Sequence, residues 1–191
     1  MKLRFSKVAR KISQILNLVL VFGFLIGGLV LSGYLFPRES MSLSGRARAS
    51  DGDSIRIADQ RIRLLGIDAP ELDQTCLDSE GATWFCGQRA RQRLGQLLGS
   101  GPVNCSFDAR DKFGRALAVC KVGGQDIGAM MVREGLAISY NDYPEQEAFA
   151  RAGKVGIWSG EFVSPRAWRD GVRQHETSGN VFGRLWDWFT R

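Results

Sequence analysis

Acidic and arginine side chains gather in three short segments of this 191-residue chain, and each segment also contains a glycine or proline turn. The segments are Asp51-Gly52-Asp53-Ser54, Arg63-Leu64-Leu65-Gly66-Ile67-Asp68-Ala69-Pro70-Glu71 and Asp111-Lys112-Phe113-Gly114-Arg115. Any one of them alone is typical of a solvated turn. Together they supply carboxylates, which ligate hard cations, and guanidinium groups, whose planar fork matches phosphate oxygens. The combination favours metal-assisted phosphate chemistry, provided that the fold brings the segments together.

Histidine and cysteine chemistry have few candidates. The only histidine is His175, in a polar stretch near the C-terminus, where we expect a solvated side chain. Four cysteines, an even number, have no histidine near them and are spaced too widely for a C-x₂₋₄-C zinc site: Cys76, Cys86, Cys105 and Cys120. We therefore expect two disulfides, which form in an oxidising compartment and leave no thiol nucleophile.

Alternating apolar and polar residues predict the strands that carry these segments. Residues 54–57 and 61–64 form a predicted hairpin that turns near Asp59-Gln60, and the chain then reads as a loop from Pro70 to about Gly87. Two further predicted strands, 103–107 and 116–122, flank the Asp111 segment. The three chemical segments thus lie at strand ends and turns.

Apolar residues at helical spacing predict three helices, over 88–98, 126–134 and 144–152. Asp126 is a suitable N-cap for the second helix, and Pro144 suits the first turn of the third. Ile157-Trp158 is expected to pack against the third helix. Short strands with interspersed helices in about 120 residues predict an α+β domain built on a small β-barrel with helices outside.

The N-terminus predicts a membrane anchor. Residues 15–36 carry no charge and are long enough to cross a hydrocarbon core of about 30 Å. Five Lys and Arg precede this run with no acidic residue, so the N-terminus is expected in the cytoplasm and the domain on the periplasmic or extracellular side. The alternative is a signal peptide cleaved at Ala47-Arg48-Ala49, which would release a secreted domain.

The net charge of +6 gives no support to nucleic-acid binding by itself. Five of the 26 Lys and Arg belong to the N-terminal flank, and the rest are nearly balanced by 20 Asp and Glu. Evidence for a nucleic-acid partner must come from individually placed residues.

In their order and spacing the three segments resemble the staphylococcal nuclease (thermonuclease) family. The resemblance covers residues 46–163 and ends in Gly156-Ile157-Trp158. It implies a five-stranded OB-type β-barrel with about three helices. It also implies calcium-dependent hydrolysis of phosphodiester bonds in DNA or RNA by what we expect to be a monomer.

The resemblance also implies roles for single residues. Asp53 and Asp68 are expected to ligate calcium together with the backbone carbonyl of Ala69. The expected phosphate-binding arginines are Arg63 and Arg115, and the expected general base is Glu71. Two carboxylates and a carbonyl leave room among the 6–8 oxygens of calcium for water and a phosphate oxygen.

Substrate contacts are implied for Lys112, Phe113 and Tyr140. The chain has Ala69 where the family prototype has threonine, which leaves a backbone ligand intact. It has Phe113 where the prototype has tyrosine, and phenylalanine cannot donate a hydroxyl to a phosphate. Tyr140 lies near where a base-stacking tyrosine is expected, with packing in the core as the other interpretation.

The prototype lacks cysteine, so the four cysteines mark a separate branch. Cys105 and Cys120 fall on the two strands that flank the Asp111 segment, and Cys76 and Cys86 bracket the loop after Glu71. We expect these two pairings among three possible connectivities.

The predicted organisation is a cytoplasmic flank (1–14), a transmembrane anchor (15–36), a tether (37–45), the nuclease-like domain (46–163) and a C-terminal extension (164–191). The extension ends in an aromatic stripe at helical spacing, formed by Phe182, Leu185, Trp186 and Phe189. Docking on the barrel, disorder and an interfacial helix are the three interpretations of this tail.

Two other functions are compatible with the same fold: a nucleic-acid-binding module of weak or no activity, and an envelope scaffolding protein. A module that only binds would have no chemical reason to keep both carboxylates, both arginines and Glu71. The sequence therefore favours an active nuclease.

Overall fold

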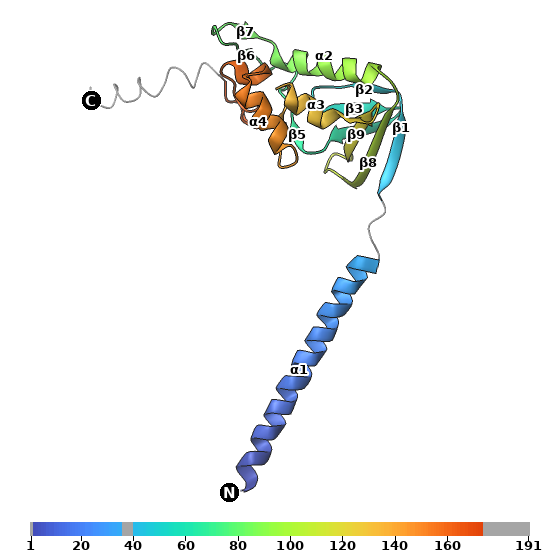
Figure 1. The fold of residues 1–191 in the computed structure, drawn as a ribbon, viewed down its shortest axis with the longest axis vertical. Coiled ribbons are helices and arrows are strands. Elements are labelled where there is room, and N and C mark those ends of the chain that lie inside the picture. Colours follow the sequence, from blue (N-terminus) through green and yellow to red (C-terminus); the bar gives the residue numbers. More distant parts are fainter. Residues whose placement is uncertain (1, 36–39, 174–191) are drawn as a thin grey trace, which may run out of the picture. The chain divides into compact units, whose positions relative to one another are not determined.

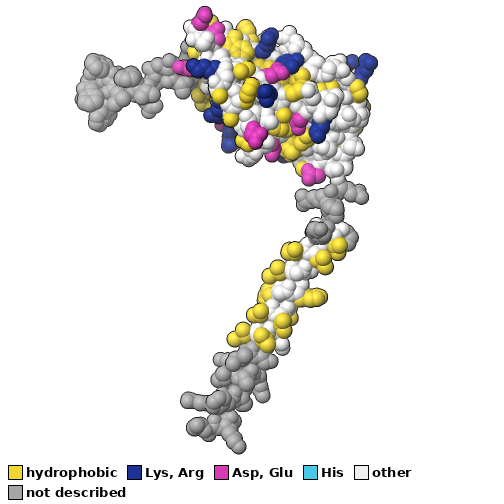
Figure 2. Space-filling view, viewed as in Figure 1, with side chains coloured by type: hydrophobic (Ala, Val, Ile, Leu, Met, Phe, Trp, Pro, Cys, Tyr) yellow, Lys and Arg dark blue, Asp and Glu magenta, His cyan; other side chains and the backbone are white. Residues whose placement is uncertain are grey.

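The computed structural model describes residues 2–35 and 40–173 and divides the chain after Glu39 into two compact units. The first unit is helix α1 (Lys2–Leu35), within which Gln14–Gly33 has a mean hydropathy of 2.5 and contains no buried residue. Figure 2 shows apolar and neutral side chains along its described part. This helix is long and apolar enough to cross a membrane, a property that N-terminal signal sequences share.

The second unit is built on one curled sheet, which confirms the predicted α+β class (Figure 1). Its order is β1 (Met41–Gly45), β8 (Val103–Arg110), β9 (Ala116–Val122), β4 (Gln60–Leu64), β3 (Ser54–Ile57) and β2 (Ala47–Ala49), with β10 (Gln125–Asp126) also pairing β9. Among the described strands, only β4 and β9 pair in parallel. The two ends of this order, β1 and β2, are consecutive in the chain and separated by Arg46 alone. The sheet therefore curls back on itself, as expected of an OB-like fold, but it has seven strands where five were expected.

The N-terminal edge of the domain differs from the prediction. Residues 41–45, expected in the tether, form β1 and pair with β8 from Met41↔Phe107 to Gly45↔Val103. The predicted cleavage site, Ala47-Arg48-Ala49, is β2 and pairs with β3. A cut after Ala49 would remove both edge segments, so cleavage there is incompatible with the sheet as observed.

The predicted helices are present, with small shifts at their ends. They are α2 (Cys86–Gly99), α3 (Ile127–Arg133) and α4 (Pro144–Ala152), followed by a 3₁₀ turn, Gly156–Ser159. Asp126 caps α3 by accepting from the backbone N–H of Ala129 at 3.1 Å. A further short helix, α5 (Pro165–Arg169), was not predicted. With α1, the described residues contain five α-helices.

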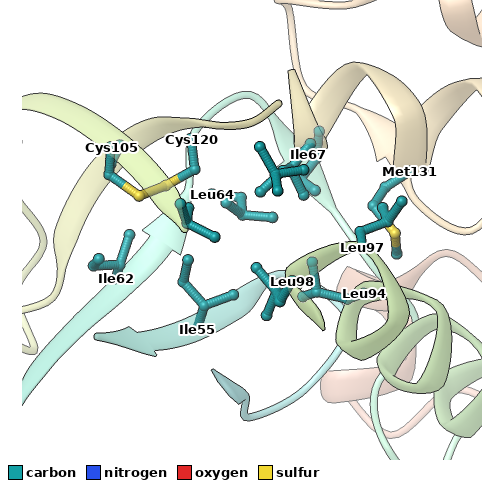
Figure 3. Packing of buried hydrophobic residues seen from close by; sticks show 14 of the residues in the cluster. Ile55, Ile62, Leu64, Ile67, Leu94, Leu97, Leu98, Cys105, Cys120 and Met131 are labelled. Atoms are coloured by element: carbon teal, nitrogen blue, oxygen red, sulfur yellow. A yellow bond between two sulfur atoms is a disulfide. The ribbon is translucent and has the colours of Figure 1, made fainter. Parts of the chain in front are cut away.

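Helix α2 packs its apolar face against the sheet to make the main core. Figure 3 shows Leu94, Leu97 and Leu98 of α2 and Met131 of α3 facing Ile55, Ile62 and Leu64 of the strands. Each large side chain buried in this way contributes about 1.5–3 kcal/mol relative to an exposed position. The core thus fixes the strand ends on which the chemical segments lie.

Both predicted disulfides form. Cys105 and Cys120 are directly opposed on β8 and β9, with Cα atoms 4.1 Å apart. Cys76 and Cys86 join β6 (Cys76–Leu77) to the start of α2, with Cα atoms 5.7 Å apart. The pairing strand of β6 is β7 (Thr83–Trp84). The loop after Glu71 is therefore closed by a covalent bond and a short hairpin.

Candidate active site

Two buried aspartates form the centre of the site. Asp53 immediately precedes β3, and Asp68 ends β5 (Ile67–Asp68), which pairs with β11 (Ile138–Ser139). Asp53 is 4% exposed and Asp68 is 7% exposed. A Cβ on Gly52 would lie 2.6 Å from the Cβ of Ala69, so only glycine allows this close approach of the two segments.

Arg63 of β4 holds both aspartates with one guanidinium group. One terminal nitrogen, Nη1, lies 2.9 Å from Asp53 Oδ1, and the other, Nη2, lies 2.8 Å from Asp68 Oδ1. The backbone N–H of Ala69 donates to Asp53 Oδ2 at 3.2 Å. The structure therefore brings together three of the predicted ligand and phosphate-binding residues, within the span of a single guanidinium.

Burial raises the pKa of Asp53 to about 7, with Arg63 opposing the shift and the Asp51 carboxylate adding to it. The Asp51 side chain also accepts the backbone N–H of Asp53 at 3.0 Å. Because the charged form of Asp53 is poorly solvated, a cation at this position would be strongly favoured. The Asp53 carboxylate is thus preorganised for a positive ligand.

Arg115 follows the turn between β8 and β9, and its partner is Asp111. The Arg115 Nε lies 2.7 Å from Asp111 Oδ2, and Nη1 donates to Ser54 Oγ at 3.3 Å. Burial opposes ionisation of Asp111, but hydrogen bonds from Arg115 and from the backbone of the turn leave its pKa lowered overall. Ser54 Oγ in turn donates to Asp53 Oδ1 at 3.0 Å, so Arg115 is linked to the aspartate pair.

Glu71 is held through its backbone. Its N–H donates to Gln74 Oε1 at 3.1 Å, and Gln74 is fully buried, with its Nε2 donating to the carbonyl of Val163 at 2.7 Å. The start of α2 lies against the same loop, because the N–H of Gly87 donates to the carbonyl of Gln74 at 3.2 Å. The main chain of Glu71 is thus fixed from two sides.

Arg169, the last residue of α5, contacts two of the predicted site residues. Its Nη1 lies 2.7 Å from Glu71 Oε1 and 3.1 Å from Asp68 Oδ1, and its Nη2 lies 3.0 Å from Asp68 Oδ2. The hydrogen bonds with Asp68, and then those with Glu71, raise the pKa of Arg169 above its ordinary value. The group is therefore a permanent cation in the site.

Most of these residues line one cavity of about 370 Å³, to whose lining Asp68 does not contribute. Its lining includes both catalytic arginine candidates, the Glu71 segment, Phe113 and Arg169: Asp51, Gly52, Asp53, Arg63, Ala69, Pro70, Glu71, Phe113, Arg115 and Arg169. A larger groove of about 890 Å³ lies along β2 and α2 and includes none of the predicted site residues. We place the chemistry in the smaller cavity because the carboxylates and arginines converge there.

The predicted substrate contacts lie at or beyond the edge of this cavity. Phe113 is 59% exposed, with Lys112 Nζ 5.1 Å and Arg115 Cζ 5.6 Å from its ring centre. Tyr140 is 63% exposed, which rules out packing in the core, and its N–H donates to the carbonyl of Gly66 at 2.7 Å. Lys112 and Tyr140 do not line the cavity itself.

The donors around Asp53 and Asp68 suit a hard divalent cation. The candidate ligand atoms of these two side chains are carboxylate oxygens, which Arg63 and Arg169 contact in this structure, and no group of three or more His, Cys, Asp or Glu among residues 2–35 and 40–173 is arranged to hold a metal. A cation here must therefore complete its shell with backbone oxygens, water or phosphate, as calcium readily does. The residues present fit such an ion.

Two contributors to the site were missed from the sequence, Gln74 and Arg169. Neither lies in a motif, and each has a partner far away in the chain, Val163 for Gln74 and Asp68 and Glu71 for Arg169. The helix that carries Arg169 did have a local signal, since Ser164 caps it by accepting from the N–H of Ala167 at 3.3 Å and Pro165 occupies its first turn. His175 and the aromatic stripe of the tail lie outside the described residues.

Comparison with known proteins adds family evidence to this geometry. A family model described as "Staphylococcal nuclease homologue" matches residues 61–160. The matched range contains Arg63, Asp68, Glu71 and Arg115, while Asp53 and Arg169 lie outside it.

Several curated proteins are similar to the chain over most of its length. An "Uncharacterized endonuclease" of Escherichia coli is 32% identical over 154 residues, covering 74% of this chain and 94% of that protein. A "Micrococcal nuclease" of Shigella flexneri is 35% identical over 144 residues, covering 64% and 77%. "Succinoglycan biosynthesis protein ExoI" of Rhizobium meliloti (strain 1021) is 33% identical over 141 residues, covering 69% and 74%.

Proposed function

The chain belongs to the staphylococcal nuclease homologue family, and from this premise we propose that it is a calcium-dependent nuclease that hydrolyses phosphodiester bonds of DNA or RNA. Relatives named as nucleases and endonucleases support the reaction class. The observation that carries the proposal is the bridging of Asp53 and Asp68 by Arg63, beside a cavity that Asp53, Arg63, Glu71 and Arg115 line.

Asp53, Asp68 and the carbonyl of Ala69 would hold the calcium ion. When bound, the ion supplies a Lewis acid for the phosphate and a site that orients water. In the structure described here Arg63 neutralises both aspartates, at 2.9 and 2.8 Å. With these carboxylates engaged by the ion, the Arg63 guanidinium would be available to bind phosphate oxygens.

Arg115 stabilises the charge that grows on the phosphate as water attacks. Its Nε is fixed on Asp111 and its Nη1 on Ser54, which orients the plane of the guanidinium toward the cavity that it lines. Five N–H donors are available on this group, so the described contacts leave donors for phosphate. Removal of one fixed donor aimed at developing negative charge typically costs about 2.7–4 kcal/mol of transition-state stabilisation.

Glu71 takes a proton from the attacking water. Its main chain is held by Gln74 and by the start of α2, and Glu71 lines the same cavity as Asp53. General bases typically contribute about 10²–10⁴ in rate. Phe113 at the rim, with Lys112 beside it and Tyr140 on the exposed surface, provides stacking and charge contacts for the nucleotides on either side of the cleaved bond.

Helix α1 anchors the enzyme in a membrane, with the N-terminal basic flank in the cytoplasm and the domain exported. Two disulfides support an oxidising compartment for the domain. Alkaline extraction of membranes followed by determination of the N-terminal sequence tests this. Recovery of a soluble protein that lacks α1 would contradict a retained anchor.

The activity test uses the full chain in detergent micelles with single-stranded DNA, duplex DNA and RNA, in calcium or in chelator. We expect cleavage in calcium and none in chelator. Magnesium should support little turnover, because its octahedral preference suits this donor set less well. Binding of substrate without cleavage would favour a binding module, and cleavage in chelator would contradict the calcium assignment.

A further inference from the structure

We propose that Arg169 is a positioning residue of the site. It holds the Glu71 carboxylate in a fixed orientation relative to the Asp68 carboxylate, and it competes with the metal ion for Asp68. The inference rests on the proposed nuclease function. It extends the site beyond the matched segment 61–160 to the short helix α5.

The contact geometry gives Arg169 two separate tasks. Both terminal nitrogens contact Asp68, at 3.1 and 3.0 Å, while Nη1 is shared with Glu71 at the shorter distance of 2.7 Å. A guanidinium is planar, with its donors in fixed directions, so the two carboxylates are held in one relative orientation. Without it the Glu71 side chain, 36% exposed, would be free to rotate into solvent.

Arg169 lies on a helix that is capped and packed against the domain, so its contacts with Asp68 and Glu71 are more than an incidental surface ion pair. Ser164 caps α5, and Trp168, which is 8% exposed, donates its Nε1–H to Asp73 Oδ1 at 3.3 Å. Gln74 joins the residue preceding that cap, Val163, to the backbone of Glu71. The helix and the base-bearing loop are thus attached to each other at several points, which lowers the entropy cost of the ion pairs.

The same contacts predict opposite effects on metal binding and on turnover. Arg169 and a calcium ion are both cations that seek the Asp68 carboxylate, so loss of the arginine should strengthen calcium binding. Loss of the arginine also frees Glu71, and misplacement of a catalytic group by about 1 Å can cost on the order of 10² in rate. A residue that merely stabilised the fold would weaken both properties together.

The experiment compares Arg169→Ala, Arg169→Lys and Arg166→Ala in the full chain in detergent. Arg166 lies on the same helix and is exposed, so its removal changes the local charge equally without touching the site. The measurements are kcat and KM on a single-stranded DNA oligonucleotide, calcium affinity by titration calorimetry and thermal stability.

For Arg169→Ala we expect kcat to fall by about tenfold or more with KM changed by less than about threefold. We expect its calcium affinity to rise by about threefold or more, with little change in thermal stability. Arg169→Lys retains the charge and loses the fork, so it should keep the parent calcium affinity with reduced kcat. Arg166→Ala should match the parent.

Three results would overturn the inference while leaving the nuclease assignment intact: unchanged kcat in Arg169→Ala, raised kcat, or a joint fall of calcium affinity and thermal stability. Raised kcat would mean that Arg169 blocks the site. A parent protein that cleaves none of the substrates overturns the proposed function, and the inference that rests on it falls as well.

Discussion

The carbonyl oxygen of Glu71 lies directly against the α-carbon of Gly87, in the first turn of α2. A Cβ at position 87 would overlap that oxygen, so glycine is required there by close approach of the backbone. The helix that forms much of the core is thereby also the support behind the proposed general base.

Gly87→Ala should therefore displace Glu71 and lower kcat by about 10²-fold, with a stability loss of about 1–3 kcal/mol from the overlap. The matched control is Gly95→Ala in the same helix, where an added Cβ meets nothing within 4 Å. This control should retain activity and gain about 0.5–1 kcal/mol. Oligonucleotide cleavage and chemical denaturation give the two readouts, and equal activity of both variants would refute the supporting contact.

The buried Asp53 should make the metal-free protein less stable as pH rises. Its pKa is about 7 in the folded state against an ordinary 3.8, so between these values the folded state keeps a proton that the unfolded state has released. The stability that this proton provides is present below pH 4 and is lost as pH rises through about 7.

Asp53→Asn removes this titration. In chelator, thermal unfolding followed by circular dichroism at pH 5 and pH 8 should show a smaller decrease for Asp53→Asn than for the parent, and at pH 8 the variant should be more stable by about 1–2 kcal/mol. Added calcium should stabilise the parent at pH 8 but not the variant. Identical pH dependence of the two proteins would show that Asp53 is charged in the fold.

The two proposed metal-ligand aspartates should differ from Glu71 and Arg115 in what their removal abolishes. Asp53→Ala and Asp68→Ala should abolish calcium-dependent cleavage while the fold survives, which circular dichroism can verify. Glu71→Gln and Arg115→Ala should each lower kcat by about 10² or more and still bind calcium. Either of the last two variants within about threefold of the parent would remove its residue from the proposed mechanism.

The two disulfides should have unequal effects on activity. Replacing both cysteines of either pair by serine should cost about 3 kcal/mol in the chain-entropy account, since the sequence separations are 10 and 15 residues. Only loss of Cys76–Cys86 should also lower kcat of the folded protein, because that bridge closes the loop that Gln74 and Gly87 flank. Equal kcat for the two folded double variants would contradict this difference.

The elements with a local signal could be predicted from the sequence. Alternation around Ile55 and Ile62 gave the β3–β4 hairpin, and two cysteines on strands joined by a single turn gave a directly opposed pair, Cys105↔Cys120. The edge strand β1 was missed because its alternation involves only two large apolar residues, Met41 and Leu43, which is too short a stretch to indicate a strand. Its pairing with β8 is a tertiary effect.

The candidate site was predicted as far as its motifs extended. Asp53, Asp68 and Arg63 are adjacent to turns and strands that the pattern indicates, whereas Gln74 sits in an irregular loop with no periodicity. Its role depends on the carbonyl of Val163, 89 residues away. Contacts of that range leave no local trace in a single sequence.

The separation of Asp68 and Arg169, 101 residues, has a consequence for the timing of assembly. Chains are synthesised from the N-terminus, so residues 163–169 emerge after every other described element of the domain. A chain that ends before these residues lacks the ion pairs of Arg169 and the hydrogen bond from Gln74 to Val163. Asp68 and Glu71 are then without these restraints. The proposed catalytic arrangement therefore forms late, after the sheet and both pairs of cysteines have been synthesised.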